Sequence, residues 1–442
     1  MNNARFTAVS VLEDVIYRGA YSNIALNNKL NNSELNLKDR ALVTEIVYGT
    51  LKYKYTIDCI LSNFLKNGLN NVDKFILNLL RISIYQIIYL DKVPEFAIVN
   101  EAVEISKKKS VKLSRLVNGV LRNYLRNKEK TYYNKNSYID KLCFKYSFPE
   151  WMVKLFINQY GKDGAENIIK GLNYTPKVTV RINGLKTNFE ETWDKLLEHG
   201  YDIEKGNMCE DAIIINRGSN IEKNSLFKEG YISVQDQSAM MAVLSLDLCE
   251  NMTVFDMCSA PGGKATYIAE KMKDKGHVYA YDIYKNKIKL IEKGAERLGI
   301  KIIKAGIQNA EKYNEKFEKS ADRVLMDVPC SGLGIIRKKP EIKWNKSMKQ
   351  LKDIVRIQKN IMMNSSRYVK TGGKMVYSTC TLNREENEEN IKWFLENKPD
   401  FKLEKINFKH LDNIVYHKEG CVTILPHENM DGFFIAKMIK YR

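Results

Sequence analysis

The chain has 442 residues, of which 44% are hydrophobic and 28% are charged, and its formal net charge is +18 at pH 7. Its length predicts two or three domains, and its composition is that of a folded, water-soluble protein and excludes a disordered one. The excess of positive charge favours a polyanionic partner such as nucleic acid, although a lysine-rich composition shared by a whole proteome would give the same excess.

The N-terminus lacks the basic start and the apolar run of a signal peptide. The longest apolar stretch, residues 75–90, is short for a membrane span and is interrupted by Asn78, Arg81 and Gln86. We therefore expect a cytoplasmic protein that does not engage a membrane. The eight cysteines form no C-x-x-C pair and lie apart from the five histidines, so we expect neither a zinc site nor disulfides.

Residues 1–130 carry apolar side chains at helical spacing and predict an all-helical domain. The stretch 75–90 is apolar nearly all round, which places it at the centre of that domain. The end of the domain is strongly basic: between residues 106 and 130 the only acid is Glu129, against Lys107, Lys108, Lys109, Lys112, Arg115, Arg122, Arg126, Lys128 and Lys130. Such a run is a solvated helix face or an RNA-binding surface, with about equal support for each. The polar stretch 131–145 then predicts a linker.

Residues 146–228 predict a small α/β domain, in which a helix begins near Pro149 and strands are expected at 177–183 and 212–215. Lys177 and Arg181 on the first of these strands suggest a contact with RNA. From 229 to 442 short apolar strands alternate with helices, at 253–257, 277–282, 301–304, 323–327 and 374–378. This alternation predicts a Rossmann-like α/β domain with a parallel, doubly wound sheet.

The strand 253–257 leads into a tight turn, whose residues are Cys258, Ser259, Ala260, Pro261, Gly262, Gly263 and Lys264. The glycines let the backbone approach a ligand closely, and the spacing is neither that of a P-loop nor G-x-G-x-x-G. The next strand ends in Asp282, whose carboxylate can accept hydrogen bonds from ribose hydroxyls. Acidic Asp256 and Asp282 suit a cationic sulfonium better than a pyrophosphate. We therefore predict a site for S-adenosylmethionine.

Two later strands each lead into a cysteine, through D-V-P-C ending at Cys330 and through S-T-C ending at Cys380. Ligands of open α/β sheets bind beyond the carboxyl ends of the strands, so both thiols are expected at the cofactor crevice. A thiolate that adds to C6 of a cytosine makes C5 nucleophilic enough to take a methyl group. Lys264 would favour the thiolate, and Asp327 could bind the Watson–Crick edge of the base. These patterns do not distinguish which cysteine attacks.

Together the motifs resemble the RsmB-type 16S rRNA cytosine-C5 methyltransferases, which belong to the wider Nop2/Sun group. The resemblance covers essentially the whole chain. The family's NusB-like RNA-binding domain is resembled by the first part of the chain, at residues 21–26, 39–48 and 48–51. Further matches to the family lie at residues 233–239, 337–344, 425–427 and 431–437. The resemblance implies transfer of a methyl group from S-adenosylmethionine to C5 of a specific cytosine in 16S rRNA.

The resemblance also implies roles for single residues. The family's Thr-Cys cysteine is the nucleophile, which corresponds to Cys380, and its Pro-Cys cysteine assists release of the product, which corresponds to Cys330. Asp327 and Lys264 would complete the catalytic site, and the run 258–264 with Asp282 and Asp327 would bind the cofactor. Asn309 stands where the family commonly has an aspartate toward the adenine, so cofactor affinity is expected to differ there.

Two alternatives stay open. The same chemistry on transfer RNA fits the catalytic motifs equally well, and the NusB-like domain favours ribosomal RNA by analogy only. A non-catalytic, antitermination-like RNA-binding protein is disfavoured by the intact turn and the two cysteines. Because a target base inside a helix must first be unstacked, we expect free or pre-assembly 16S rRNA as the partner. We expect a monomer because no coiled-coil seam is visible.

Overall fold

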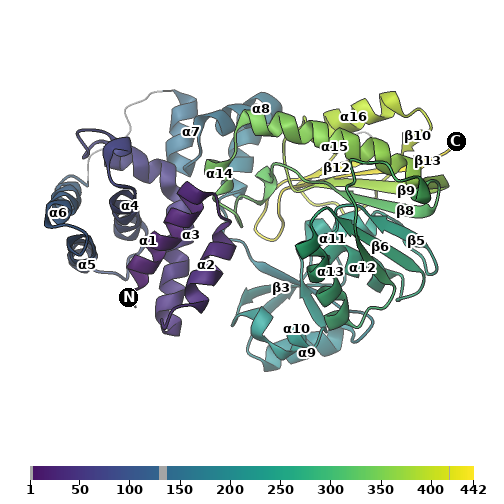
Figure 1. Cartoon of the computed structure of the whole chain (residues 1–442), viewed down its shortest axis with the longest axis horizontal. Coiled ribbons are helices and arrows are strands. Elements are labelled where there is room, and N and C mark those ends of the chain that lie inside the picture. The colour runs from purple at the N-terminus through teal and green to yellow at the C-terminus, as the bar shows by residue number, and fades with distance from the viewer. Residues whose placement is uncertain (1–2, 129–136, 418) are drawn as a thin grey trace. The chain divides into compact units, whose positions relative to one another are not determined.

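The computed structural model describes residues 3–128, 137–417 and 419–442, and the chain forms two compact units (Figure 1). Unit 1 comprises Met1–Asn173 and Ile336–Lys346, and unit 2 comprises Tyr174–Ile335 and Ser347–Arg442. The described residues include no helix that is both long enough and apolar enough to cross a lipid bilayer.

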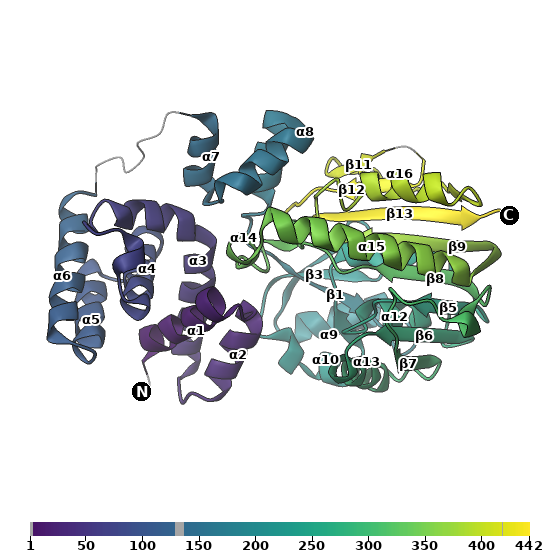
Figure 2. The same ribbon diagram turned by 45° about the horizontal axis from the view of Figure 1, so that its top comes forward.

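The large sheet of unit 2 begins with five parallel strands, in the spatial order β7 (Ile303–Ile307), β6 (His277–Asp282), β5 (Thr253–Asp256), β8 (Ala321–Asp327) and β9 (Val369–Thr379). Antiparallel strands extend it beyond β9, in the order β13 (Phe433–Lys440), β12 (Cys421–Ile424) and β11 (Ile414–Tyr416), and β10 (Phe401–Leu403) also pairs with β13. Figure 2 shows the strands from β13 to β7 side by side.

Helices cover both faces of this sheet because side chains of both faces are apolar. Val254, Leu325 and Val376 pack with α11 (Gln237–Leu244), α12 (Gly263–Lys271) and α13 (Lys285–Leu298). Their neighbours Phe255 and Met375 point the other way and pack with α15 (Met348–Tyr368) and α16 (Glu388–Asn397). Alternate residues of a strand face opposite sides of a sheet, so near-continuous apolar strands require two helical layers. The predicted doubly wound α/β fold is confirmed, with an antiparallel extension that the sequence pattern did not predict.

The small sheet of unit 2 is antiparallel, in the order β2 (Asp202–Lys205), β3 (Ala212–Arg217), β1 (Val178–Ile182) and β4 (Ile232–Val234). Its core contains the buried side chains of Val180, Ile213 and Ile232, against which α9 (Phe189–Glu198) and α10 (Ser225–Lys228) pack. A small mixed α/β element was therefore correctly predicted in this part of the chain.

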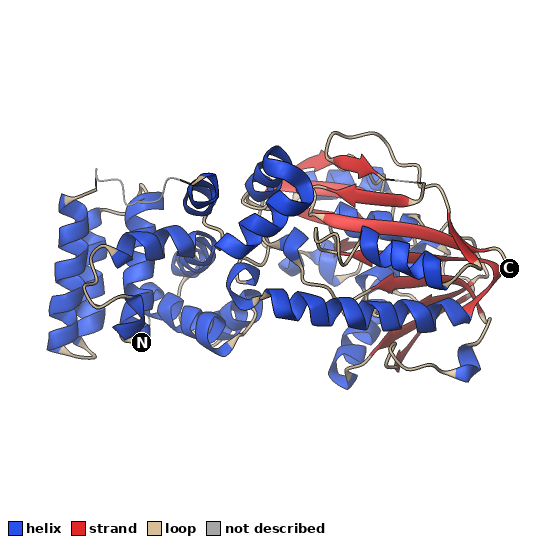
Figure 3. Cartoon of the chain, turned by 90° about the horizontal axis from the view of Figure 1, so that it is seen from above, coloured by secondary structure: helices blue, strands red, loops and turns tan. Residues whose placement is uncertain are grey.

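All described elements of unit 1 are helices, as Figure 3 shows. They are α1 (Ala4–Arg18), α2 (Ser22–Asn31), α3 (Leu37–Ser62), η1 (Leu69–Asn71), α4 (Lys74–Tyr89), α5 (Glu95–Lys107), α6 (Val111–Arg126), α7 (Tyr138–Tyr146), α8 (Glu150–Gly171) and α14 (Ile342–Asn345). Helix α4 lies in its core, where Ile76, Leu79 and Ile82 are completely buried. Arg81 is accommodated there by a two-point ion pair with Asp58 (2.7 and 3.0 Å). The predicted central position of residues 75–90 is confirmed.

The first part of unit 1 extends to Asn173, beyond the helical domain predicted for residues 1–130. Residues 131–136 of the predicted linker 131–145 lie outside the described residues, but residues 138–145 belong to α7. The side chain of Ser137 caps this helix by accepting a hydrogen bond from Asp140 N (3.1 Å). Helix α8, predicted to belong with the small α/β domain, groups with unit 1. Ile139, Leu142, Cys143 and Tyr146 recur at helical spacing, so this helix was visible in the sequence and the linker prediction overlooked it.

A segment from the second half of the chain, residues 336–346, also belongs to unit 1, although the sequence placed it within the domain 229–442. The carboxylate of Glu341 accepts hydrogen bonds from the backbone N–H (3.0 Å) and the hydroxyl (2.8 Å) of Ser22. The indole N–H of Trp344 donates to Leu51 O (2.8 Å). Contacts across such sequence separations leave no trace in local periodicity.

Lys343 is the most deeply buried basic side chain of this segment, with 1% of its surface exposed, and this burial lowers the pKa of its ammonium group. Its ammonium donates to Lys52 O (3.2 Å), Ser147 O (3.1 Å) and Asn173 Oδ1 (3.1 Å). It also lies 3.8 Å from the ring centroid of Phe148. The segment is therefore anchored by one side chain that supplies donors to three acceptors.

We predict that Lys343→Met destabilises the protein by about 2–4 kcal/mol, because three acceptors lose their donor. The measurement is the midpoint of thermal or denaturant unfolding. Lys346→Met, a substitution of the same kind at a less buried position three residues further on, is the control. Equal midpoints for the two variants would contradict the anchoring role of Lys343.

Candidate functional site

A cavity of about 360 Å³ lies beyond the carboxyl ends of the parallel strands of unit 2. Its lining lies at or just beyond the ends of four parallel strands and on two helices. The strand ends of β5, β6, β7 and β8 contribute Met257, Cys258, Ala260, Asp282, Ile283, Tyr284, Gln308, Asn309, Ala310, Glu311, Asp327 and Pro329, and the helices contribute Lys287 of α13 and Ile357 and Ile361 of α15. Its volume falls within the range of small-molecule sites, roughly 300–1,000 Å³. This is the place that the sheet topology predicts for a ligand.

The glycine turn joins the cavity to α12. Ser259 N donates to Tyr281 O (2.8 Å), Gly262 N donates to Ser259 O (2.8 Å), and α12 starts at Gly263. Gly262 has φ 104°, which a side chain would strain, and a Cβ there would lie 3.1 Å from Ile291 Cα. Cys258 and Ala260 of the predicted run 258–264 line the cavity, while the two glycines shape the turn beside it.

The two aspartates expected to suit a cationic ligand lie in different environments. Asp282 lines the cavity, and its Oδ1 accepts a hydrogen bond from Tyr284 N (3.1 Å). Asp256 is completely buried, and this burial raises its pKa to about 7. Its charge is therefore only partial near neutral pH, and of the two aspartates Asp282 is the one positioned to meet a ligand. Asn309 also lines the cavity, with its Oδ1 accepting from Glu311 N (2.9 Å).

The two predicted cysteines meet at the end of two neighbouring strands. Strands β8 and β9 are parallel, with Asp327 paired to Ser378 in register. Cys330 and Cys380 follow these positions, and their Sγ atoms are 3.2 Å apart. The contact is between thiols, since both cysteines are free. The structure therefore brings together residues that are 50 positions apart in the sequence.

Asp327 connects this thiol pair to the glycine turn. Its Oδ2 accepts from Lys264 Nζ (2.6 Å), and its Oδ1 accepts from the hydroxyl of Ser378 (2.9 Å). Burial alone would lower the pKa of Lys264, but Asp327, Asp256 and Cys380 raise it above its ordinary value. Lys264 is thus a stable ammonium, as the sequence argument requires.

The environment of Cys330 favours the protonated thiol. Its contact with Cys380, its burial and the charges of Glu386 and Asp327 all raise its pKa well above the ordinary value. A thiol in this state keeps its proton near neutral pH and is a poor nucleophile. The two cysteines are thus placed in unlike surroundings, with cationic Lys264 acting on Cys380 and anionic Glu386 acting on Cys330.

Glu386 is a site residue that the sequence did not reveal. Its completely buried carboxylate accepts from Ser331 N (2.9 Å), Ser331 Oγ (2.5 Å), Asn383 Nδ2 (3.1 Å) and Gln358 Nε2 (3.0 Å). It therefore joins the residue after Cys330 to the loop after Cys380. In the sequence it stands inside the acidic run 385–389, which reads as a solvated helix start, and no spacing marks it as buried.

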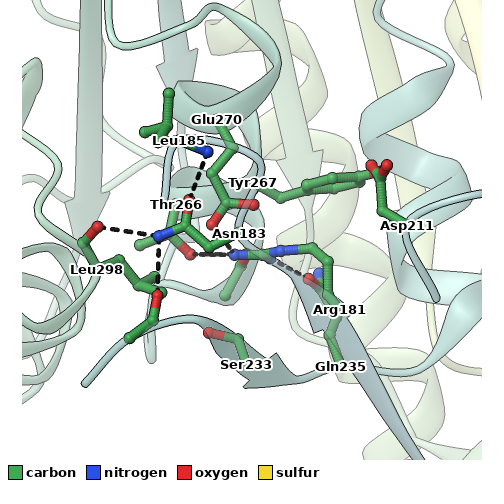
Figure 4. A network of polar contacts seen from close by, with 12 residues as sticks. Arg181, Asn183, Leu185, Asp211, Ser233, Gln235, Thr266, Tyr267, Glu270 and Leu298 are labelled. Atoms are coloured by element: carbon green, nitrogen blue, oxygen red, sulfur yellow. Dashed lines mark hydrogen bonds and ion pairs between the residues drawn. The ribbon is translucent and has the colours of Figure 1, made fainter. Parts of the chain in front are cut away.

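The prediction that Arg181 contacts RNA is wrong. Arg181 is completely buried, and its guanidinium forms an ion pair with Glu270 on α12 (2.6 Å; Figure 4). Lys177 remains partly exposed but pairs with Glu204 (3.0 Å). The sequence alone does not distinguish a basic strand residue that faces solvent from one that faces a neighbouring helix.

Comparisons with known proteins agree along the whole chain. Residues 243–439 match the family described as 16S rRNA methyltransferase RsmB/F, residues 2–126 the NusB family, and residues 148–222 a ferredoxin-like domain of RsmF/B-like methyltransferases. A relative from Bacillus subtilis, named probable ribosomal RNA small subunit methyltransferase B, is 40% identical over 99% of both chains. Its namesake from Synechocystis is 34% identical over the full length of both.

Solved structures show the same architecture. The crystal structure of PH0851 matches with a TM-score of 0.85 at 28% identity and covers 98% of this chain and 99% of that one. The structure of NSun6 from Pyrococcus horikoshii with SFG matches with a TM-score of 0.60 at 22% identity, over 67% of this chain and 99% of that one, which supports the fold alone. The cofactor is S-adenosylmethionine. With full-length relatives, all three domains and the cysteine pair in place, the chain belongs to the 16S rRNA methyltransferase RsmB/F family.

Proposed function

We propose that this protein transfers a methyl group from S-adenosylmethionine to C5 of a cytosine in 16S rRNA, with Cys380 as the nucleophile and Cys330 as the thiol that assists release. The observation that carries the proposal is the 3.2 Å approach of the two thiols at the ends of β8 and β9. Asp327, between them and the glycine turn, also lines the cavity. A thiol pair beside a cofactor cavity suits carbon methylation, which needs covalent activation of the base.

The residues at the cavity fit the cofactor. Asp282 at the end of β6 would accept hydrogen bonds from ribose hydroxyls, and Asn309 after β7 would lie on the adenine side. Ile283, Ile357 and Ile361 supply apolar walls for a ring. Cys258 and Ala260, from the turn 258–264, complete the lining beside β5. Bound S-adenosylmethionine supplies an electrophilic methyl group on a cationic sulfur.

Cys380 acts on the base in this scheme. Its Sγ forms a bond to C6 of the cytosine, and the electron pair of the C5–C6 double bond moves to C5. C5 then takes the methyl group as the methyl–sulfur bond of the sulfonium breaks, and its electron pair leaves a neutral thioether. C5 then loses its proton while the bond from C6 to sulfur breaks, which restores the aromatic ring and the free thiolate. Lys264 favours the thiolate, and Asp327, fixed by Lys264 and Ser378, holds the edge of the base.

Ribosomal RNA is the substrate that the whole chain supports best. One face of α6 in unit 1 carries four exposed basic side chains, those of Lys112, Arg115, Arg122 and Arg126. The opposite face, which includes Val117, is buried. A row of exposed cations suits a phosphate backbone. The matched relatives are named for ribosomal RNA of the small subunit. Transfer RNA is the competing substrate, because the catalytic residues would act on it in the same way.

We predict that labelled S-adenosylmethionine and unmodified 16S rRNA yield labelled 5-methylcytidine with this protein. Bulk transfer RNA is assayed in parallel, and the labelled nucleoside is identified after digestion. Label in transfer RNA alone would contradict the substrate but retain the mechanism. Label in another nucleoside would contradict the mechanism.

We predict that Glu386→Gln lowers the turnover rate about 100-fold, the effect of a small displacement of reacting groups. Glutamine replaces one acceptor oxygen by a donor, which would then face donors of Ser331, Asn383 or Gln358. The affinity for S-adenosylmethionine is expected to stay near that of the wild type, since the carboxylate is directed at the loops that follow β8 and β9. The measurements are turnover at saturating substrates and cofactor binding by calorimetry.

Glu389→Gln is the matched control for this prediction, because Glu389 lies only three residues further on, in the first turn of α16, and is exposed. It should leave turnover unchanged. Full activity of Glu386→Gln would show that the buried carboxylate does not align the thiols.

A further inference from the structure

The side chain of Arg181 points away from the small sheet and contacts α12, as Figure 4 shows. It belongs to β1, yet its guanidinium donates to Gly263 O (2.8 Å), Thr266 Oγ1 (3.2 Å) and Glu270 Oε1 (2.6 Å), all on α12. It also donates to Gln235 Oε1. The group is completely buried, so each of these hydrogen bonds is shielded from water.

The bond to Gly263 O reaches the glycine turn directly. Gly263 is the last glycine of the turn and the first residue of α12, and its backbone follows the left-handed Gly262. The guanidinium thus holds the first turn of α12 from outside the methyltransferase sheet. A shift of that turn would also move Lys264, the partner of Asp327.

Attachment of the small sheet does not by itself explain this arrangement. Asn183, just after β1, already donates to Gly230 O and to Leu298 O at the end of α13 (both 2.9 Å). Arg297, also on α13, donates to Ile232 O (2.9 Å) and to the hydroxyl of Ser233 (2.9 Å). These contacts fasten the sheet to α13 without touching the glycine turn.

The buried ion pair of Arg181 and Glu270 also leaves polar atoms without partners, so stability alone does not explain it. Within the described part of the chain, Arg181 Nε and Glu270 Oε2 are buried without a hydrogen-bond partner. Burial raises the pKa of Glu270 even though Arg181 opposes the shift. Buried ion pairs often stabilise a fold no better than apolar side chains of similar size. A role in positioning the first turn of α12 explains the buried guanidinium of Arg181.

We propose that Arg181 is a positioning residue of the S-adenosylmethionine site, which fixes the glycine turn through the first turn of α12. This inference rests on the proposed assignment of the turn 258–264 to the cofactor. It predicts that cofactor affinity depends on a residue of the small sheet that touches neither the cofactor nor the base.

The decisive variant is the double substitution Arg181→Met with Glu270→Met, which removes both charges and keeps an apolar contact. We expect its Kd for S-adenosylmethionine, measured by calorimetry without RNA, to rise about 10-fold, with an unfolding midpoint close to that of the wild type. In turnover assays the KM for S-adenosylmethionine should rise while kcat at saturating cofactor changes little. Arg181→Lys, which keeps the charge but cannot reach the three partners on α12 together, should weaken binding to a smaller extent and serves if the double variant does not fold.

Asn183→Ala is the matched control, because it removes a polar contact from the same interface but leaves α12 untouched. Its Kd for the cofactor should equal that of the wild type. Wild-type affinity in the folded double variant or in Arg181→Lys would overturn the proposal. An equal loss in Asn183→Ala would also overturn it, since the effect would then belong to the interface as a whole. Because binding is measured without RNA, failure of the proposed methylation of cytosine would not affect this comparison.

Discussion

The parallel pairing of β8 with β9 is the constraint on which the proposed chemistry depends. Parallel strands end at the same edge of a sheet, so residues that follow them meet although they are distant in the sequence. Asp327 and Ser378 are opposite each other at this edge and share a hydrogen bond, and the thiols of Cys330 and Cys380 meet just beyond. The turn after β5 contributes Lys264 to the same edge.

Charge distinguishes two thiols that the sequence presents as equivalent. Cys380 is influenced by the ammonium of Lys264, whereas Cys330 experiences the carboxylates of Glu386 and Asp327. A cation favours a thiolate, and an anion favours a thiol. The surroundings of Cys330 thus suit the proposed role of a thiol that keeps its proton, with Cys380 as the proposed nucleophile beside it.

The features that were predictable from the sequence are local ones. The strands, the glycine turn and the two cysteines are each visible within a dozen residues, and the parallel sheet then places them at one edge. The sequence could not show that Arg181 turns inward, that residues 336–346 join unit 1 or that Glu386 is buried. Each of these depends on partners far along the chain, as with Arg181 and Glu270, and a charged side chain looks the same in sequence whether buried or exposed.

The most direct test of the assigned thiols compares Cys330→Ala with Cys380→Ala on unmodified 16S rRNA in the presence of S-adenosylmethionine. Protein linked to RNA is detected on a denaturing gel, and the linked peptide is identified by mass spectrometry. If Cys380 attacks and Cys330 assists release, Cys330→Ala accumulates an adduct through Cys380, while Cys380→Ala forms no adduct and no product. An adduct through Cys330 in the Cys380→Ala protein would contradict the assignment.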